Sequence, residues 1–177
     1  MNNYAAAILW GGLAAGALDI VYAFVVYGPL SYGLTLTEVL QSVAAGWLGR
    51  EASHAGGLAT ALIGLVTHFT IATAMAAVFV AASARLTFLA ARPLLWGLLY
   101  GIVLYVAMNY VVVPLSAAGA EGQFPTNFAD ISERLRASFS KLKTNQAYPW
   151  MIWGTLFTHT VLVGAPIALI ARRFLRS

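Results

Sequence analysis

The chain alternates between long apolar runs and shorter stretches that carry nearly all of its charge. Four of the runs are long enough to cross a hydrocarbon core, which needs about 20 apolar residues. They are Ala5 to Tyr27, Leu58 to Ala82, Leu94 to Leu115 and Trp150 to Ala171. Each is expected to be a helix, because a helix satisfies its own backbone hydrogen bonds in lipid. The pattern therefore predicts an all-α integral membrane protein with four transmembrane helices, forming one membrane domain over residues 1–177.

Two of the connections between these runs are themselves patterned. Thr35 stands three residues before Glu38 in one, and Asp130 stands three residues before Glu133 in the other. Both spacings resemble the capping box that begins a helix. Apolar residues then recur at helical spacing: Val39, Leu40, Val43 and Trp47 in the first, and Ile131, Leu135, Phe139 and Leu142 in the second. We expect two short amphipathic helices at the membrane interface, the alternative being a soluble cap packed only on protein.

The sequence also contains an internal repeat, over residues 5–83 and 94–172. A Gly-x-x-x-Gly motif precedes a Pro-Leu-Ser sequence twice, at an offset of 85 residues. The matched positions are Gly12, Gly16 and Pro29 in one half and Gly97, Gly101 and Pro114 in the other. A Thr-His pair follows in each half, Thr67-His68 and Thr158-His159, at an offset of 91 residues. Since each half holds two spans, the repeat predicts two similar hairpins related by a pseudo-two-fold axis along the membrane normal.

Composition and charge narrow the class further. Hydrophobic residues make up 60% of the chain and charged residues 9%, whereas soluble domains are about a quarter charged. The absence of cysteine excludes disulfides, thiolate nucleophiles and cysteine-ligated metals or iron–sulfur clusters. The first apolar run is too long for a signal-peptide core, so we expect it to be retained. The net charge of +4 lies at the membrane edges and predicts orientation rather than nucleic-acid binding.

Orientation follows from the position of the basic residues, because their number is divided equally between the two sides. One group abuts the ends of the spans: Arg85, Arg92, Arg172, Arg173 and Arg176. The other consists of Arg50, Arg134, Arg136, Lys141 and Lys143, of which four lie in one long connection beside acidic residues. Basic residues next to span ends favour the cytoplasmic side. We therefore predict that both termini are cytoplasmic.

Polar residues within the spans are the candidates for function. Asp19, His68 and His159 each lie 9 to 11 residues from the outer end of a span, which at 1.5 Å per residue is roughly 13 to 17 Å deep. Asn109 lies about 8 Å deep by the same count. Asp19 shares a stripe with the small residues Gly12 and Gly16, which favour close helix contacts. The sequence thus predicts a buried intramembrane polar layer of Asp19, His68 and His159, with Asn109 at its outer side.

The chemistry of these residues suggests proton exchange. An ionised aspartate at the bilayer centre costs about 2.5 to 3.5 kcal/mol, so Asp19 is expected to have His68 or His159 as a partner. Histidine changes its charge near physiological pH, as a proton relay or a pH sensor requires. The supporting residues are Thr67, Thr158 and Tyr105, and Pro166 should free the Leu162 carbonyl and kink its helix near His159. His54 is expected to lie on the solvated surface, and the structural alternative is that both intramembrane histidines only bond neighbouring helices.

The second half carries a family resemblance. "LLWGLLYGIVLYVAMNYVVVPLSAAG" at residues 94–119 and "WGTLFTHTVLVGAPIALIARR" at residues 153–173, in a four-span layout, resemble the YagU-like group of small bacterial inner-membrane proteins. The resemblance implies four spans, a place in the bacterial inner (cytoplasmic) membrane and a broad link to acid tolerance. The resemblance is weaker in the first half, and the first connection differs from the family pattern. No catalytic residue is transferred by the resemblance.

Three interpretations of function remain open. The first is a small inner-membrane protein whose Asp19, His68 and His159 handle protons or a small solute. The second is a membrane subunit that binds haem b or a metal ion through His68 and His159, although no cofactor is the default. The third is a structural or assembly protein of the membrane. An enzyme is disfavoured, because no nucleophile–base pair or phosphate-binding loop is visible. The expected partners are the lipid bilayer and either a second copy or another membrane subunit, and no nucleic acid.

Overall fold

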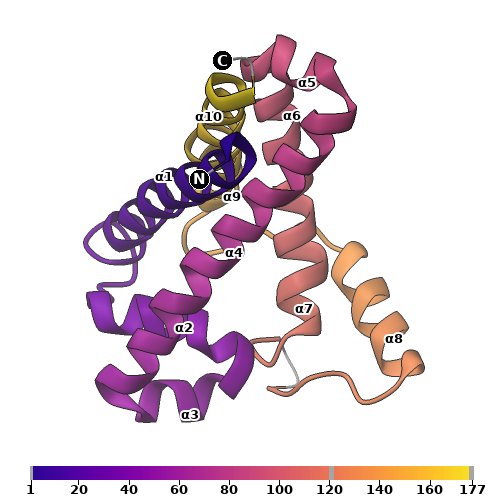
Figure 1. Ribbon diagram of the computed structural model, residues 1–177. Helices are drawn as coiled ribbons and strands as arrows, with labels where there is room; N and C mark the ends of the chain where they lie inside the picture. Colours follow the sequence, from indigo (N-terminus) through magenta and orange to yellow (C-terminus); the bar gives the residue numbers. More distant parts are fainter. Residues whose placement is uncertain (1, 120–121, 176–177) are drawn as a thin grey trace. The chain divides into compact units, whose positions relative to one another are not determined.

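The structure is a computed structural model that describes residues 2–119 and 122–175, and the described residues form helices joined by turns and loops (Figure 1). The first half contains α1 (Asn3–Tyr27), α2 (Leu36–Leu48), α3 (Arg50–Ala55) and α4 (Gly57–Arg85), followed by α5 (Thr87–Ala91). The second half contains α6 (Pro93–Val106), η1 (Ala107–Val112), α7 (Val113–Leu115), α8 (Phe128–Phe139), α9 (Met151–Phe157), η2 (Thr158–Gly164) and α10 (Ala165–Leu175). The all-α prediction is confirmed.

Within the described residues, four helices are long and apolar enough to cross a membrane, and each coincides with a predicted span. Two are α1 and α4, and two are composite helices over Pro93–Leu115 and Met151–Leu175. Large apolar side chains remain exposed along them, among them Leu58, Val66, Val78 and Val103. Side chains of this kind are stable against lipid and not against water. The chain is therefore a multi-pass membrane protein with short additional helices.

The chain divides into two compact units. The first comprises Met1–Tyr22, His68–Tyr105 and Trp153–Ser177, and the second comprises Ala23–Thr67 and Val106–Ile152.

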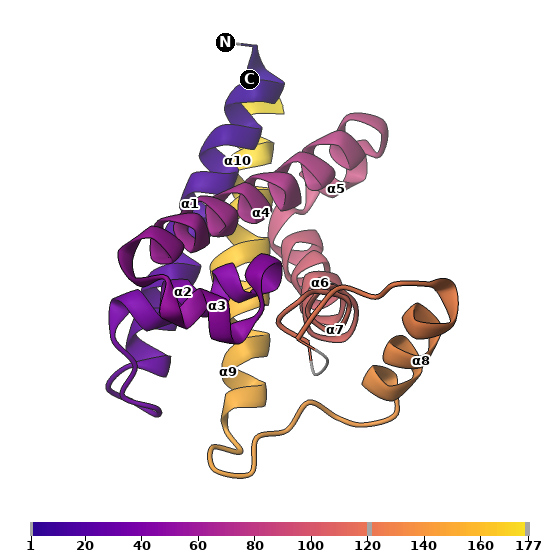
Figure 2. The ribbon, with the colours of Figure 1, turned by 90° about the horizontal axis from the view of Figure 1, so that it is seen from below.

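Small residues dominate the core of the first unit. Its buried cluster consists of Ala7, Ala15, Ala76, Phe79, Val80, Leu104, Val163, Ile167, Ala168 and Ala171. Alanine and glycine let helix backbones approach closely, which is how membrane helices associate without a hydrophobic driving force between them. A side-chain carbon built on Gly11 would lie 3.9 Å from the Ile167 Cα, so α1 and α10 pass side by side (Figure 2). The Tyr100 hydroxyl adds a hydrogen bond of 2.7 Å to the Met75 carbonyl oxygen.

Both composite helices contain a π-helical segment that ends two residues before a proline. The N–H of Val113 donates to Met108 and that of Ala165 donates to Thr160, in each case five residues back. Pro114 and Pro166 lie two residues beyond these segments. Proline has no N–H and its ring collides with the carbonyl one turn earlier, and a wider turn accommodates both effects. The sequence predicted a kink at Pro166, and the irregular segment of the structure extends back through His159.

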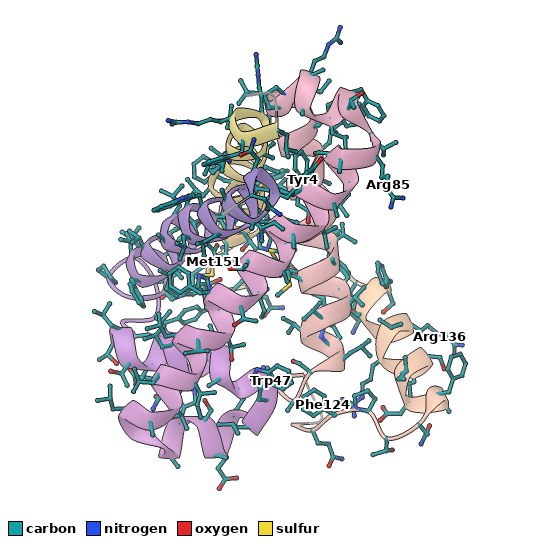
Figure 3. The ribbon with its side chains drawn as sticks, viewed as in Figure 1. Tyr4, Trp47, Arg85, Phe124, Arg136 and Met151 are labelled. Carbon is teal, nitrogen blue, oxygen red and sulfur yellow. The ribbon has the colours of Figure 1, made fainter. Side chains whose placement is uncertain are left out.

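In the second unit, α2 begins as predicted. The Thr35 hydroxyl accepts from the Glu38 N–H at 3.3 Å, and the Glu38 carboxylate accepts from the Thr35 N–H at 2.8 Å. This confirms the first capping box. The predicted apolar face of α2 is only partly covered, because Val39 is buried while the Trp47 side chain stays exposed. The Trp47 and Phe124 rings lie 6.1 Å apart between centroids (Figure 3).

A polar network that the sequence analysis missed joins α2, α3 and the start of α4. The buried Gln41 amide donates to the Gly57 carbonyl oxygen at 2.9 Å, and the Ser53 hydroxyl donates to the Gln41 carbonyl oxygen. The Thr60 hydroxyl donates to the Ser53 carbonyl oxygen at 2.6 Å. Buried polar groups need such partners, so this network fixes the three helices together.

The predicted start of α8 is wrong by three residues. Asn127, not Asp130, caps the helix, since its side-chain oxygen accepts from the Asp130 N–H at 3.0 Å. Asp130 instead accepts from the Thr126 N–H at 3.1 Å and pairs with Arg134. Asn and Asp cap helices equally well, so two candidates three residues apart compete and the earlier one begins the helix. The helix ends at Phe139, and Leu142 of the predicted apolar face lies beyond it.

Candidate functional site

Two of the predicted intramembrane residues meet in the first unit. Asp19 lies on α1 and His68 lies on α4, and the His68 Nδ1 atom is 3.9 Å from an Asp19 carboxylate oxygen. This places a titratable ring beside a carboxylate, although the separation exceeds a hydrogen bond.

The other nitrogen of His68 is held by the backbone of α1. Nε2 lies 2.9 Å from the Gly16 carbonyl oxygen. A carbonyl oxygen can only accept, so the hydrogen in this bond belongs to Nε2. Nδ1, the other ring nitrogen, is the atom that faces Asp19.

The sequence allows this contact because residue 16 is glycine. A side-chain carbon built there would lie 2.8 Å from the Phe69 ring, closer than such atoms approach in proteins. The absence of that carbon lets α4 pass close to α1. The Phe69 ring in turn meets the His68 ring edge-on, with centroids 5.4 Å apart at an interplanar angle of 89°.

His159 has a different environment. Its Nδ1 atom lies 2.8 Å from the Thr155 carbonyl oxygen, one turn earlier on the same helix. Nδ1 therefore carries the hydrogen, and Nε2 is left as the basic nitrogen. The Tyr105 ring stands edge-on to the His159 ring at 5.9 Å and 85°.

The predicted layer is not buried, which is a correction to the sequence analysis. The side chains are 11% exposed for His68 and 30% exposed for Asp19, and His159 is also only partly covered. The depth count along a helix fixes the level of a side chain but not whether another helix covers it. Only 28% of the most apolar window of α1, and the same share of α4, is buried, so much of each helix surface faces outward.

The supporting residues divide between several roles. Thr67 accepts a hydrogen bond from the Trp47 ring nitrogen at 3.1 Å in the second unit, so it supports α2 rather than His68. Thr158 is buried, and its hydroxyl has no hydrogen-bond partner among the residues that the structure describes. Tyr105 contacts His159 as described. Asn109 lies on η1 within the second unit, whereas the Asp19–His68 pair is built from first-unit residues alone.

The haem or metal interpretation, through His68 and His159, stays a prediction. Each of these rings has one nitrogen bonded to a backbone carbonyl oxygen, Nε2 in His68 and Nδ1 in His159. Among residues 2–119 and 122–175, no three His, Asp or Glu side chains are arranged to hold a metal ion.

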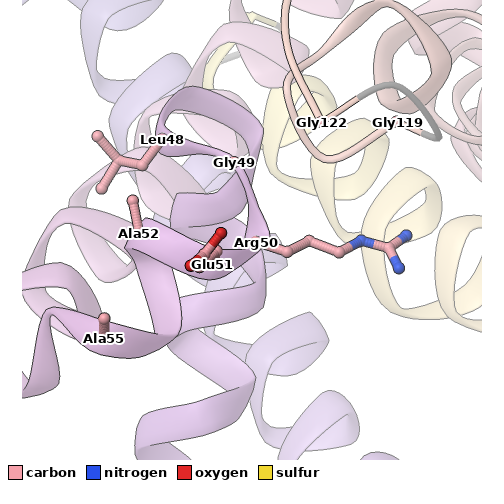
Figure 4. Close-up of a pocket in the computed structure, with 8 residues that line it drawn as sticks. All are labelled: Leu48, Gly49, Arg50, Glu51, Ala52, Ala55, Gly119 and Gly122. Carbon is pink, nitrogen blue, oxygen red and sulfur yellow. The ribbon is translucent and has the colours of Figure 1, made fainter.

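Two pockets lie in the second unit. One, of about 590 Å³, is lined by the end of α2, by α3 and by Gly119 and Gly122 (Figure 4). The Arg50 guanidinium donates to the Ala118 carbonyl oxygen at 3.2 Å beside it. The other, of about 920 Å³, lies along α8 and includes Lys143, whose ammonium is 5.6 Å from the centre of the Tyr110 ring. Both are lined by residues other than the predicted intramembrane ones.

Comparison of the chain with protein-family models, with curated proteins and with solved structures yields no match.

Proposed function

We propose that this membrane protein handles protons through Asp19 and His68, which together hold one exchangeable proton within the transmembrane helices. In one form His68 is an imidazolium beside the Asp19 carboxylate. In the other, a neutral His68 lies beside a protonated Asp19. The two forms differ in the location of a proton between Nδ1 and the carboxyl group, and a further proton can enter or leave from either.

The observation that carries the proposal is the bond from His68 Nε2 to the Gly16 carbonyl oxygen. The backbone of α1 holds the Nε2 atom through this bond, so Nδ1 is the ring nitrogen that we propose exchanges a proton. If Nδ1 held no proton, its lone pair would face the negative carboxylate at 3.9 Å, which is unfavourable in a medium of low dielectric. A proton between the two groups removes that repulsion.

Other titratable groups near the pair are His159 and Tyr22. Tyr22 follows Asp19 by one turn on α1 and packs on Phe157, with ring centroids 6.3 Å apart. No other acidic residue belongs to the first unit, so Asp19 is its sole negative side chain. A histidine beside a carboxylate makes the charge of the site sensitive to pH.

We further propose that the protein lies in the bacterial inner membrane with both termini cytoplasmic. The support is the group of basic residues at one end of the first unit, where α5 contacts α10. Arg85 and Arg92 flank α5, and Arg172 and Arg173 lie in the last turn of α10. Arg176 of the predicted group lies outside the described residues. A role in acid tolerance rests on the resemblance to the YagU-like group and is part of the same proposal.

The test is a pH titration of the three histidines by nitrogen NMR, on protein labelled at histidine in lipid nanodiscs. Wild type is compared with Asp19→Asn, which preserves the shape of the side chain and removes its charge. We expect the pH at which His68 titrates to move by about one unit or more, as removal of a neighbouring charge does elsewhere.

Two internal controls are available. His54 is exposed on α3 and should titrate at the same pH in both proteins. Glu51→Gln, one turn before His54, is a matched carboxylate change outside the first unit and should leave His68 unaffected. If Asp19→Asn leaves the His68 titration where it was, the pair does not share a proton and the proposal fails.

A further inference from the structure

The contacts of four glycines in the first unit follow a regular rule. A side-chain carbon built on Gly12 would meet the Thr73 Cα at 2.6 Å, and one built on Gly97 would meet the Gly164 carbonyl oxygen at 2.8 Å. One built on Gly16 would meet the Phe69 ring, and one on Gly101 would overlap the Thr160 Cα. Gly97 and Gly101 lie 85 residues after Gly12 and Gly16. The residues that they contact, Gly164 and Thr160, lie 91 residues after Thr73 and Phe69.

These are the offsets that align the two halves of the sequence. The Gly-x-x-x-Gly and Pro-Leu-Ser motifs match at 85 and the Thr-His motifs at 91, and neither value depends on any contact. The contact between α1 and α4 therefore uses residues that correspond to those in the contact between α6 and the composite helix Met151–Leu175. This agreement supports an internal duplication, because unrelated helix pairs have no reason to share both offsets.

The same offsets make Leu104 the counterpart of Asp19 and His159 the counterpart of His68. Asp19 follows Gly16 by three residues, as Leu104 follows Gly101. Leu104 is 6% exposed and belongs to the apolar core together with Val163 and Ile167. The second half therefore retains the histidine and has an apolar side chain where the first half has a carboxylate.

The two histidines differ accordingly in what surrounds them. His68 faces the Asp19 carboxylate, the Gly16 carbonyl oxygen and the Phe69 ring. His159 faces the Thr155 carbonyl oxygen and the Tyr105 ring. The Tyr105 phenol beside His159 stays neutral below about pH 10.

We propose that the residue at this repeated position decides which histidine exchanges a proton. Asp19 makes His68 the proton-exchanging member, and Leu104 leaves His159 as a neutral, structural counterpart. This inference rests on the proposed function of the Asp19–His68 pair, and it adds Leu104 as the residue that limits the chain to one such site.

The test compares both histidines in the same samples. Between wild type and Asp19→Asn, the pH at which His68 titrates should change by at least about three times as much as the pH at which His159 titrates. Equal movement of both would overturn the inference while leaving the proposed function standing. No movement of either would instead refute the proposed function.

A second variant tests Leu104 directly. Leu104→Asp should bring the pH response of His159 under the control of residue 104, so that His159 then titrates at a different pH than in the matched Leu104→Asn protein. Identical His159 titrations in folded Asp and Asn variants would overturn the inference. If the buried aspartate prevents folding, the Asp19→Asn comparison still decides, because it leaves residue 104 unchanged.

Discussion

The Nε2 atom of His68 lies 2.9 Å from the carbonyl oxygen of Gly16, across the contact between α4 and α1. A histidine ring in lipid needs a partner for each nitrogen, and here one partner is a backbone group that cannot titrate. The bond also fixes the ring orientation, so that Nδ1 is directed at Asp19. In His159 the other ring nitrogen, Nδ1, makes the corresponding bond, to the Thr155 carbonyl oxygen of its own helix.

We predict opposite tautomers for the two intramembrane histidines when both are neutral. His68 should carry its hydrogen on Nε2 and His159 on Nδ1, because each of these atoms faces a carbonyl oxygen. Nitrogen chemical shifts of histidine-labelled protein at alkaline pH distinguish the two forms. The exposed His54 gives the reference for a ring in water. An Nδ1–H tautomer at His68 would contradict the geometry of the site.

Alanine at Gly101 is expected to destabilise the protein. The added carbon would overlap the His159 carbonyl oxygen and the Thr160 Cα, and backbone atoms cannot rotate away. We expect a loss of about 1 to 3 kcal/mol, typical of overpacking, measured as the free energy of unfolding in mixed detergent. Gly46→Ala is the control, since its nearest neighbour would be the Ser116 Cβ at 4.0 Å. That change should be neutral or stabilising, because alanine favours the helix. Equal losses in both variants would argue against the close helix contact.

The start of α2 should weaken in acid. Hydrogen bonds from the Thr35 N–H and hydroxyl hold the pKa of Glu38 below its ordinary value of 4.5. A lowered folded-state pKa stabilises the helix at pH values above the ordinary pKa, and this contribution is lost as the pH falls through the lowered value. Amide hydrogen exchange in the first turn of α2 should therefore accelerate below about pH 4.5 after correction for intrinsic rates. Glu38→Gln should remove this dependence. If the variant keeps the same acid response, another group is responsible.

Orientation can be tested with reporters fused to the C terminus. If the arginines around α5 and at the end of α10 face the cytoplasm, a fluorescent reporter should be active there and alkaline phosphatase inactive. A fusion after Phe124, in the connection before α8, should give the reverse pattern. Phosphatase activity at the C terminus would invert the proposed topology.

Some features of the fold were predictable because they depend on composition or on neighbours in the sequence. The lengths of the four apolar runs sufficed for the four spans, since a membrane helix is set by the thickness of the lipid. The Thr35–Glu38 capping box was predictable because its bonds join residues three apart. The same logic misplaced the start of α8, where Asn127 and Asp130 both qualify as caps and local pattern alone does not rank them.

The candidate site was only partly predictable. Asp19 and His68 were recognised because charge and imidazole are costly in lipid and so attract attention in an apolar run. The partner of His68 Nε2 was not, because a backbone carbonyl exists at every residue and only the close passage of α4 over Gly16 selects this one. For the same reason the Gln41 network was missed, since its bonds join residues 7 to 16 apart with no local pattern.

The sequence by itself determined the class of protein, the number of spans and which polar residues lie within them, because these depend on hydrophobic length and residue type. Tertiary structure alone decided how those residues are used. It turned His68 toward a carboxylate and His159 toward its own helix, left the predicted layer partly exposed, and enclosed Leu104 in an apolar core. The physical reason is that helix periodicity fixes the level and direction of a side chain, whereas its partners depend on where a second helix crosses the first.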